Sequence, residues 1–272
     1  MAVVSEQLIS QFEADGVVKI PGLVDPDRLA AIHGVAEREL AIPGEWTSDT
    51  NPGATTNRLF TTRYLWQHDQ AINDFVYHSG VAEVAATLMQ STTARFYFDH
   101  LLVKEPQTSA PTPWHQDIPY WPFLGKQIAS VWVSLTKTTV DQSSLEFVRG
   151  SHRWDSYFAP VNFDAAVEDW TADFVGEQCP DIEANRADYD IVGFDVEPGD
   201  ALVFSAWIVH GSPANRWAER RAALSTRWLG DDTTWAPHPG SDPTDHEGNL
   251  SADVGVSGGR SPPTTGVESL AA

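Results

Sequence analysis

Cysteine and long apolar runs are the two clearest absences from this sequence. Cys179 is the only cysteine among 272 residues, so no internal disulfide can form and a zinc site rich in thiolates is excluded. No stretch approaches the ~18 consecutive apolar residues of a membrane span. The N-terminal sequence MAVVSEQLISQFEADG has neither the basic region nor the apolar core of a signal peptide. We therefore expect a soluble, cytoplasmic protein.

Basic residues are also scarce. Lysine and arginine together number 17, against 38 aspartate and glutamate residues, which gives a formal net charge of −21. Such a field repels nucleic acids and anionic membranes, so we expect neither as a partner. The hydrophobic content of 42% and the charged content of 20% are those of an ordinary globular protein. The composition leaves a monomer and a homodimer equally open.

Two helices are predicted near the N-terminus. Apolar residues at helical spacing predict a first helix that Gly16 ends. A second helix is predicted over 26–40, with Asp25 as its N-cap and Pro26 at its first position. The sequence VVKIPG between these two segments predicts a short strand.

The next segment, residues 41–68, is rich in Thr, Asn, Gly and Pro, and this composition predicts a long loop or lid. Residues 69–78 predict a third helix. A fourth helix is predicted to begin at a cap formed by Ser79 and to extend through Met89.

After residue 90 the pattern changes to strand-length runs. Aromatic and β-branched residues dominate these runs, and turn sequences such as EPGD separate them. Helices followed by many short strands predict a mainly β fold with flanking helices, whose core is a double-stranded β-helix, or cupin-like jelly-roll. The predicted strands are ARFYFDHLLVK, IASVWVSL, LEFV, IVGFDV, ALVFSAWIVHG and RAALSTRWL.

A single domain is predicted over residues 1–237, with a helical part at 1–90 and the jelly-roll core at about 91–230. Residues 155–190 hold scattered acids and aromatics and predict an insertion with some helix. Residues 238–272 are dominated by Gly, Ser, Pro, Thr and Asp, and they predict a loose C-terminal tail.

His115 and Asp117 stand two residues apart in the run WHQDIPYW. On an extended strand, both side chains would point to the same face. His210, which we expect at the end of the strand ALVFSAWIVHG, is a third candidate ligand. Two neutral imidazoles and one carboxylate, with positions left open for an oxidant and a bidentate cosubstrate, are the ligand set of Fe(II) oxygenases. For the pair alone, the alternative is a strand histidine hydrogen-bonded to a nearby carboxylate.

Several motifs occur in a fixed order around these three residues: the run from Trp114 to Phe123, LEFVRGSH at 145–152, EPGDALVFSAWIVHGSPANRW at 197–217, and the pair Arg220 and Arg221. With the opening FEADGVVKIPGLVD, the sequence over roughly 8–230 resembles the phytanoyl-CoA dioxygenase family of Fe(II)/2-oxoglutarate-dependent oxygenases. The resemblance implies Fe(II), 2-oxoglutarate and O2 as cofactors. It assigns the metal ligands to His115, Asp117 and His210.

The resemblance also implies a cosubstrate pocket. The family places an arginine eleven residues after the distal histidine, to bind the far carboxylate of 2-oxoglutarate, and Arg221 holds that position. Arg220 is the competitor, since neighbours on a strand face opposite ways and only one can point inward. Lys104 and Trp132 fall on strands that line the pocket in the family. Their alternatives are a surface lysine and a core tryptophan.

Four residues near the metal motif are candidates for the substrate pocket. Trp114, Tyr120 and Trp121 flank His115 and Asp117, and packing is their alternative role, because large aromatic side chains commonly form core. His100 precedes the motif on a predicted strand, and its alternative is a core histidine with satisfied hydrogen bonds.

The function that this sequence predicts is hydroxylation of a small, secondary-metabolite-like molecule, with release of succinate and CO2. Desaturation, epoxidation and ring closure stay open, whereas the carboxylate of Asp117 disfavours halogenation. A metal-dependent hydrolase or isomerase on a cupin-like barrel would not need Arg221, and a non-catalytic jelly-roll binding module is a third possibility. The charge of −21 fits poorly with a polyanionic CoA ester. We expect a small, largely apolar substrate or an amine in an aromatic pocket.

Overall fold

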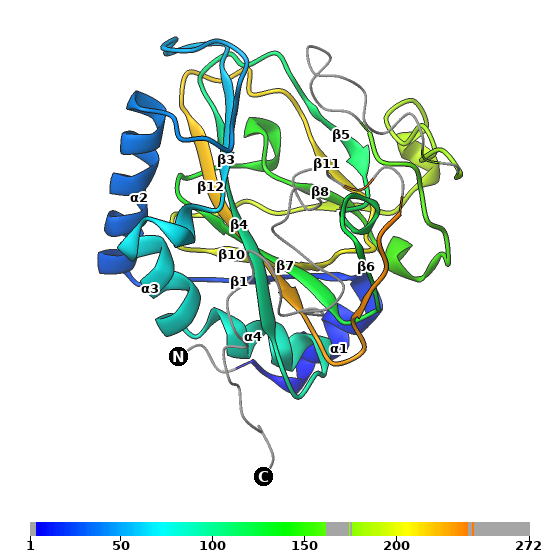
Figure 1. The fold of residues 1–272 in the computed structure, drawn as a ribbon. Helices are drawn as coiled ribbons and strands as arrows, with labels where there is room; N and C mark the ends of the chain where they lie inside the picture. Colours follow the sequence, from blue (N-terminus) through cyan, green and yellow to red (C-terminus); the bar gives the residue numbers. More distant parts are fainter. Residues whose placement is uncertain (1–3, 162–173, 175, 239–240, 242–272) are drawn as a thin grey trace.

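Two antiparallel β-sheets form the centre of the computed structural model, which describes residues 4–161, 174, 176–238 and 241 (Figure 1). The larger sheet has seven strands in the order β1-β10-β7-β12-β4-β3-β2. These strands are β1 (Val17–Ile20), β2 (Thr47–Asp49), β3 (Leu59–Arg63), β4 (Arg95–Lys104), β7 (Ile128–Ser134), β10 (Ala201–Ser205) and β12 (Arg221–Leu229).

The smaller sheet has four strands in the order β5-β11-β8-β9, and it lies on the side of the molecule away from α2 and α3 (Figure 1). Strands β6 and β13 form a separate two-stranded sheet. These strands are β5 (Thr112–His115), β6 (Phe123–Leu124), β8 (Glu146–Val148), β9 (Ile191–Gly193), β11 (His210–Ser212) and β13 (Thr234–Trp235).

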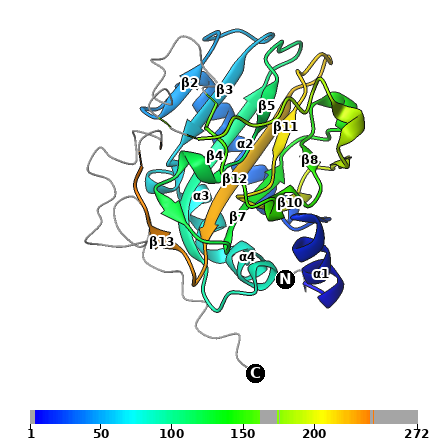
Figure 2. The ribbon, with the colours of Figure 1, turned by 90° about the vertical axis from the view of Figure 1, so that its right-hand side faces the viewer.

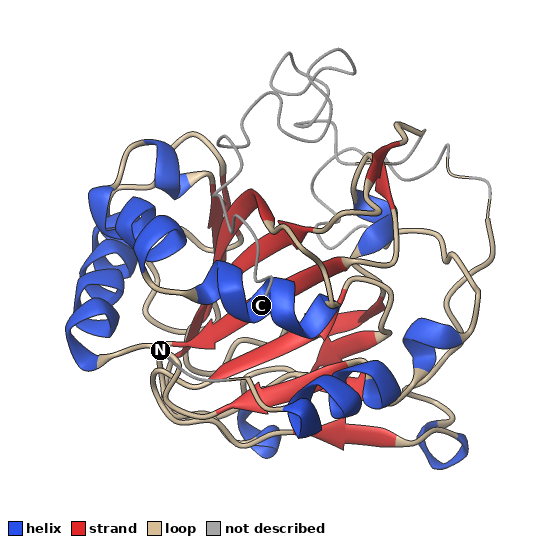
Figure 3. Ribbon diagram, turned by 90° about the horizontal axis from the view of Figure 1, so that it is seen from below, coloured by secondary structure: helices blue, strands red, loops and turns tan. Residues whose placement is uncertain are grey.

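In the described part of the chain, four α-helices pack on the larger sheet (Figure 3). The predicted starts and stops hold for the first two: Gly16 ends the first helix with a left-handed φ of 82°, and the Asp25 side chain accepts a hydrogen bond from the Arg28 amide at the start of the second. The helices are α1 (Glu6–Asp15), α2 (Pro26–Ala41), α3 (Gln70–His78) and α4 (Val81–Met89). Among the described residues, none of the helices is both long and apolar enough to span a bilayer.

The start of α4 differs by one residue from the prediction. Gly80, in a left-handed conformation, is the N-cap, not Ser79. The Ser79 hydroxyl still accepts a hydrogen bond from the Val81 amide at 3.3 Å, so it satisfies one of the free donors at the start of this helix.

The two faces of strand β12 line different parts of the interior. The strand runs between β7 and β4 in the larger sheet (Figure 2). Side chains on a strand alternate between faces, and here Ala222, Leu224 and Trp228 join the apolar core under the helices. The alternate positions therefore point into the space between the sheets, and they are Arg221, Ala223, Ser225 and Arg227.

Two predicted features of the chain path were wrong. The expected loop at 41–68 contains β2, β3 and the 3-10 helix Leu65–Gln67, because the short run LFTTR pairs with β4 and buries Phe60. The expected single strand ALVFSAWIVHG is two strands, β10 and β11, in different sheets. His210 therefore begins a strand instead of ending one.

The predicted insertion at 155–190 lies partly outside the described residues, and its described part contains the 3-10 helix Arg186–Asp188. Of the predicted tail at 238–272, only residues 238 and 241 are described. The other 3-10 helices are Ile118–Tyr120, Val140–Gln142 and Ser151–Arg153.

Candidate metal centre

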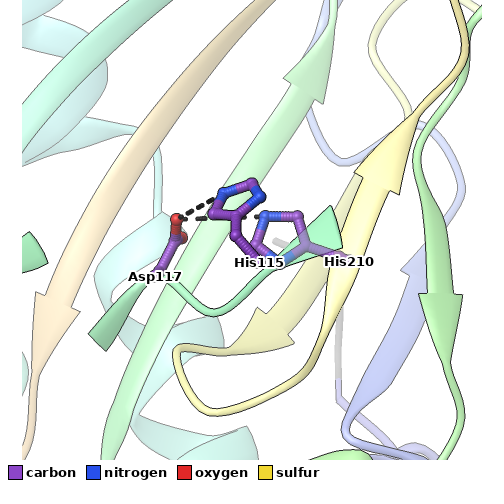
Figure 4. A group of neighbouring side chains, drawn as sticks. All are labelled: His115, Asp117 and His210. Carbon is purple, nitrogen blue, oxygen red and sulfur yellow. Dashed lines mark ion pairs between the residues drawn. The ribbon is translucent and has the colours of Figure 1, made fainter. Parts of the chain in front are cut away.

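The two candidate histidine ligands are direct cross-strand neighbours. His115 ends β5, His210 begins β11, and these strands pair antiparallel with His210 opposite His115. Directly opposed residues have Cβ atoms about 5 Å apart on the same face. The imidazole centroids accordingly lie 4.3 Å apart (Figure 4).

Asp117 reaches the histidines by a different route from the predicted one. The strand ends at His115, and Asp117 has helical backbone angles (φ −75°, ψ −36°) as it opens the 3-10 helix Ile118–Tyr120. The expectation that strand alternation aligns the pair was therefore wrong. The turn instead holds the carboxylate beside the imidazoles: Asp117 Oδ1 lies 3.6 Å from His115 Nε2 and 3.9 Å from His210 Nε2 (Figure 4).

A carbonyl group anchors this turn. The oxygen of Ala206 accepts hydrogen bonds from the amides of Asp117 and Ile118, both at 3.0 Å. Ala206 lies in the segment between β10 and β11 that leads to His210. The backbone that carries the carboxylate is thus bonded to the backbone that carries the distal histidine.

Backbone carbonyls orient both imidazoles. His115 Nδ1 lies 2.7 Å from the oxygen of Pro113, and His210 Nδ1 lies 3.1 Å from the oxygen of Ile208. A carbonyl only accepts, so each Nδ1 must carry the proton, and each Nε2 presents its lone pair toward Asp117. Hydrogen bonds of this kind fix the tautomer of metal-binding histidines.

The electrostatics suit a bound cation. Burial would raise the pKa of Asp117, but the neighbouring side chains of His115, His210 and Arg227 outweigh it, so the pKa is lowered. Burial lowers the pKa of His210 to about 4. An anionic carboxylate and a neutral imidazole are the protonation states that metal binding requires. The ligand atoms of His115, Asp117 and His210 all lie within 4.8 Å of one another, and two nitrogens with one oxygen fit Fe(II).

A second group of predicted residues gathers further along the space between the sheets. The Arg221 guanidinium lies 5.0 Å from the Trp132 ring centroid, and its Nε donates to the oxygen of Ser143 at 3.1 Å. Arg221 forms no ion pair with any described carboxylate. Lys104 is buried opposite Arg221 in the register of β4 and β12, and its Nζ donates to Ser212 Oγ at 2.8 Å.

Burial of the Arg221 and Lys104 side chains disfavours their charged forms. It lowers the pKa of Arg221 to about 10, and burial together with the charge of Arg221 lowers the pKa of Lys104 well below its usual value. The Trp132 indole nitrogen is also buried, and no described residue accepts its hydrogen bond. Two cations and one unmatched donor in one enclosed place are stabilised when an anion binds there.

Arg220 faces the other way. Its guanidinium pairs with Glu105 at 2.8 Å and with Glu37 at the outer face of the sheet. Of the two neighbouring arginines, Arg221 is the one that points inward.

The four candidate pocket residues divide by location. Tyr120 stacks edge-on against His115 at 5.7 Å, and its hydroxyl donates to the oxygen of Val161 at 2.8 Å. His100 faces the interior on β4, and its pKa is lowered by burial and by neighbouring arginines. Trp121 packs in the aromatic cluster with Tyr97 and Phe98.

Trp114 is the most peripheral of the four, because its indole donates to Glu183 at 3.1 Å in an exposed position. His152, in the motif LEFVRGSH, lies in the 3-10 helix Ser151–Arg153, and its Nε2 lies 3.0 Å from the oxygen of Glu13.

Two residues at this site were missed from the sequence. Ser130 on β7 donates to Asp117 Oδ2 at 2.9 Å, and Arg227 on β12 is the cross-strand neighbour of Ser130. A signal was present for both: each stands an even number of residues from a predicted pocket residue on its own strand, Ser130 from Trp132 and Arg227 from Arg221.

A family model described as phytanoyl-CoA dioxygenase matches residues 12–223. The chain belongs to the phytanoyl-CoA dioxygenase family. The predicted family is confirmed.

Individual members of the phytanoyl-CoA dioxygenase family are distant in sequence. A probable phytanoyl-CoA dioxygenase of Caenorhabditis elegans is 27% identical over 170 residues, which cover 60% of this chain and 52% of that protein, so the chain spans about half the length of this relative. The multifunctional dioxygenase ausE of Emericella nidulans is 24% identical over 240 residues, which cover 81% of this chain and 72% of that protein.

Among solved structures, the epimerase SnoN in complex with Fe3+, alpha ketoglutarate and nogalamycin RO has a TM-score of 0.67 at 23% identity, covering 85% of this chain and 86% of that chain. This likeness is one of fold, and it confirms the predicted mainly β, jelly-roll architecture with flanking helices.

Proposed function

We propose that this protein is an Fe(II)/2-oxoglutarate-dependent dioxygenase that hydroxylates a small molecule and releases succinate and CO2. The observation that carries the proposal is the inward-facing Arg221, a buried guanidinium with no described carboxylate partner, in the same sheet as Ser130, whose hydroxyl donates to Asp117. A metal site alone is common to many enzyme classes. A metal site with a buried cation at a set distance suits a dicarboxylate cosubstrate.

The distance between the candidate metal ligands and Arg221 supports a site for both iron and 2-oxoglutarate. Ser130, which holds Asp117, and Trp132, which lies against Arg221, are two residues apart on β7. Two strand residues span ~7 Å. The metal ligands and the guanidinium are therefore separated by a distance that a five-carbon dicarboxylate bridges when one of its ends binds the metal.

Each residue then has a defined task. His115, Asp117 and His210 hold the iron, which supplies the activation of O2 that side chains lack. Arg221 binds the far carboxylate of 2-oxoglutarate through two parallel hydrogen bonds, and Lys104 adds a second positive charge. Trp132 forms one wall of the cosubstrate pocket.

The substrate side of the site is aromatic, which favours a small organic molecule over a macromolecule. Tyr120 is buried against His115, and Trp121 is buried in the aromatic cluster with Tyr97 and Phe98. Relatives with small-molecule chemistry support the same class of substrate, since SnoN comes from nogalamycin biosynthesis. Desaturation, epoxidation and ring closure use the same cofactors and are alternative outcomes of the same activity.

The first experiment measures succinate. Purified protein is mixed with Fe(II), 2-oxoglutarate and air, and succinate is followed over time, because this reaction proceeds slowly even without the second substrate. A metal-dependent hydrolase or isomerase on the same triad would form none. Absence of succinate together with absence of any effect of 2-oxoglutarate on the melting temperature contradicts the proposal.

The second experiment separates the two arginines. In the Mn(II)-loaded protein, Arg221→Ala should weaken 2-oxoglutarate binding by about 10- to 100-fold, which is the loss expected for charge-assisted hydrogen bonds, and leave Mn(II) affinity unchanged. Arg220→Ala is the matched control, because its guanidinium pairs with Glu105 on the opposite face. Calorimetric titration checks both, and a larger loss from Arg220→Ala would refute the assignment.

A further inference from the structure

Arg227 is a buried cation that pairs with no carboxylate among the described residues. It projects from the inner face of β12, and only 6% of its surface is exposed. Its Nε and Nη1 atoms are buried and have no hydrogen-bond partner among the residues that the structure describes. No carboxylate in that part of the chain lies within ion-pair distance of it.

Another buried arginine shows what a structural guanidinium looks like in this protein. Arg58 is 4% exposed, and it makes a close ion pair with Asp49 at 2.7 Å and a hydrogen bond to the oxygen of Leu40. Burial of an unpaired charge is expensive, whereas a paired one is tolerated. Arg227, like Arg221, has no described carboxylate partner, and a buried guanidinium in this state calls for a ligand.

The nearest acidic side chains are already engaged. Asp117 accepts a hydrogen bond from Ser130 and lies against both histidines. Asp99 accepts hydrogen bonds from the amides of Leu65 and Trp66, each at 3.0 Å. Both acids lower the local potential at Arg227, but neither offers it an oxygen at bonding distance, so the bonding partner must come from outside the described chain.

Arg227 lies close to the candidate metal centre and far from Arg221. It is the cross-strand neighbour of Ser130, the residue that holds Asp117, and it stands six positions after Arg221 on the same strand. Six strand residues separate the two backbone positions by ~20 Å. A group bound at Arg227 and a cosubstrate carboxylate bound at Arg221 therefore occupy different ends of the site.

The walls around Arg227 are aromatic. Its guanidinium carbon lies 5.1 Å from the Phe98 ring centroid and 5.9 Å from that of Trp121. Stacking on rings leaves the in-plane N–H groups free to donate, and these match the two oxygens of a carboxylate. The rings favour an apolar or aromatic body next to that carboxylate.

We propose that Arg227 is the substrate-recognition residue of this site and that it binds a carboxylate carried by an otherwise apolar substrate. This proposal rests on the proposed function, because it takes the His115, Asp117 and His210 cluster as the reaction centre. It also revises the expectation of an amine, which a buried guanidinium repels. Arg227 is a binding residue for an organic monoacid, distinct from Arg221 in both position and ligand.

The test uses matched acids and amides. The probes are benzoate, phenylacetate, 3-phenylpropanoate and 4-phenylbutanoate, each compared with its primary amide, and they are titrated into the full chain loaded with Mn(II) and 2-oxoglutarate. At least one acid should bind about 10-fold or more tightly than its own amide, the difference expected for a charge-assisted hydrogen bond. In Arg227→Gln this preference should disappear, and in Arg227→Lys part of it should persist. Arg220→Gln is the control and should keep the preference.

A second readout concerns the ligand-free protein. If Arg227 is kept for a ligand, Arg227→Met should melt at the same or a higher temperature than the unsubstituted protein, because it removes an unpaired buried charge and keeps most of the volume. A clear fall in melting temperature would assign Arg227 a structural role and overturn the proposal.

The remaining outcomes are equally decisive. If no acid is preferred over its amide, or if the preference survives Arg227→Gln, the proposal is wrong. If Arg227→Gln weakens 2-oxoglutarate itself by as much as Arg221→Ala does, Arg227 belongs to the cosubstrate pocket and the proposal is also wrong. Failure of the proposed function has a separate signature, since the unsubstituted protein would then not bind 2-oxoglutarate at all.

Discussion

Ser130 illustrates how a residue that binds no metal can still control the metal site. Its hydroxyl donates to Asp117 Oδ2, and Asp117 Oδ1 is the oxygen nearest to both histidines. The hydrogen bond therefore fixes which oxygen faces the metal position. Because Ser130 belongs to the larger sheet and the histidines to the smaller one, this bond also joins the two sheets at the site.

Ser130→Ala should weaken metal binding by about 10- to 100-fold, the usual cost of losing a partner that orients a ligand. Ser134→Ala is the matched control: Ser134 lies on the same strand, and its hydroxyl donates to the oxygen of Thr136 instead. Titration with Co(II), followed by its visible absorption, measures both affinities. Equal affinities for the two variants would show that Asp117 does not depend on Ser130.

Asp99 predicts an unusual dependence of stability on pH. Burial raises its pKa to about 6 against the opposing effect of the amides of Trp66 and Leu65. A carboxyl group whose folded pKa exceeds its unfolded value of 3.8 binds more protons when folded, so its contribution becomes less favourable as the pH rises from about 4 to about 6.

The comparison that isolates this effect uses Asp99→Asn, which does not titrate. Relative to that variant, the free energy of unfolding of the unsubstituted protein should fall by about 1 kcal/mol between about pH 5 and pH 7. Urea denaturation at the two pH values measures it. A difference that moves in the opposite direction would mean that the amide hydrogen bonds dominate and that the pKa of Asp99 is lowered.

At the scale of elements, β12 performs two tasks with its two faces. Leu224 and Trp228 support the helices, and Arg221, Ser225 and Arg227 line the interior. We therefore expect substitutions at even-numbered positions of this strand to change the stability of the protein. Substitutions at odd-numbered positions should change ligand binding.

Leu224→Ala should reduce the free energy of unfolding by about 2–5 kcal/mol, because it leaves a cavity in the core, and it should leave the 2-oxoglutarate affinity of the folded protein within roughly twofold. Ser225→Ala, one residue further on, removes a buried hydroxyl that has no described hydrogen-bond partner, and it should cost little stability. Thermal unfolding and calorimetry measure the two quantities. Equal stability losses would contradict the division between faces.

Strong local patterns made most elements predictable. The caps at Asp25 and Gly16 and the branched and aromatic runs of β4, β7 and β12 follow from local chemistry. The break between β10 and β11 could not be predicted from local chemistry. Nothing in the apolar run ALVFSAWIVHG marks where the chain crosses from one sheet to the other. The short strands β3 and β2 at one end of the larger sheet depend on pairing, β3 with β4 and β2 with β3, which is a tertiary effect.

The candidate metal ligands were predicted from their residue types and spacing, and the structure brings them together, but the reason given for Asp117 was wrong. Its side chain is placed by a turn that the distant Ala206 carbonyl stabilises, and such a contact is not visible in sequence. Ser130 and Arg227 were missed for a related reason. Their even spacing from Trp132 and Arg221 was the signal in the sequence, and it points to one shared site only when the strand partners are known.

For the whole molecule, charge is distributed unequally between outside and inside. The chain has a net charge of −21, yet Lys104, Arg221 and Arg227 are buried in its interior. An approaching anion first meets a repulsive field and only then an attractive site. The repulsion acts over long distances and is screened by salt, whereas buried charges are screened much less.

The association rate of 2-oxoglutarate should therefore rise severalfold when the ionic strength increases from about 10 mM to about 150 mM, as the screening length falls from roughly 30 Å to roughly 8 Å. Stopped-flow measurement of tryptophan fluorescence follows the rate. A neutral ligand, 4-phenylbutanamide, serves as the control and should show no such change. An association rate that falls with salt would show that local attraction governs the encounter.

The Ala206 carbonyl has a consequence for how the site takes up and loses its metal. Since this one oxygen holds the backbone of Asp117 and belongs to the segment that leads to His210, the ligands keep their arrangement without an ion to organise them. Little conformational entropy is then lost on metal binding. Removal of the metal should leave a folded protein ready to be reloaded, with the amide hydrogens of Asp117 and Ile118 still slow to exchange with solvent.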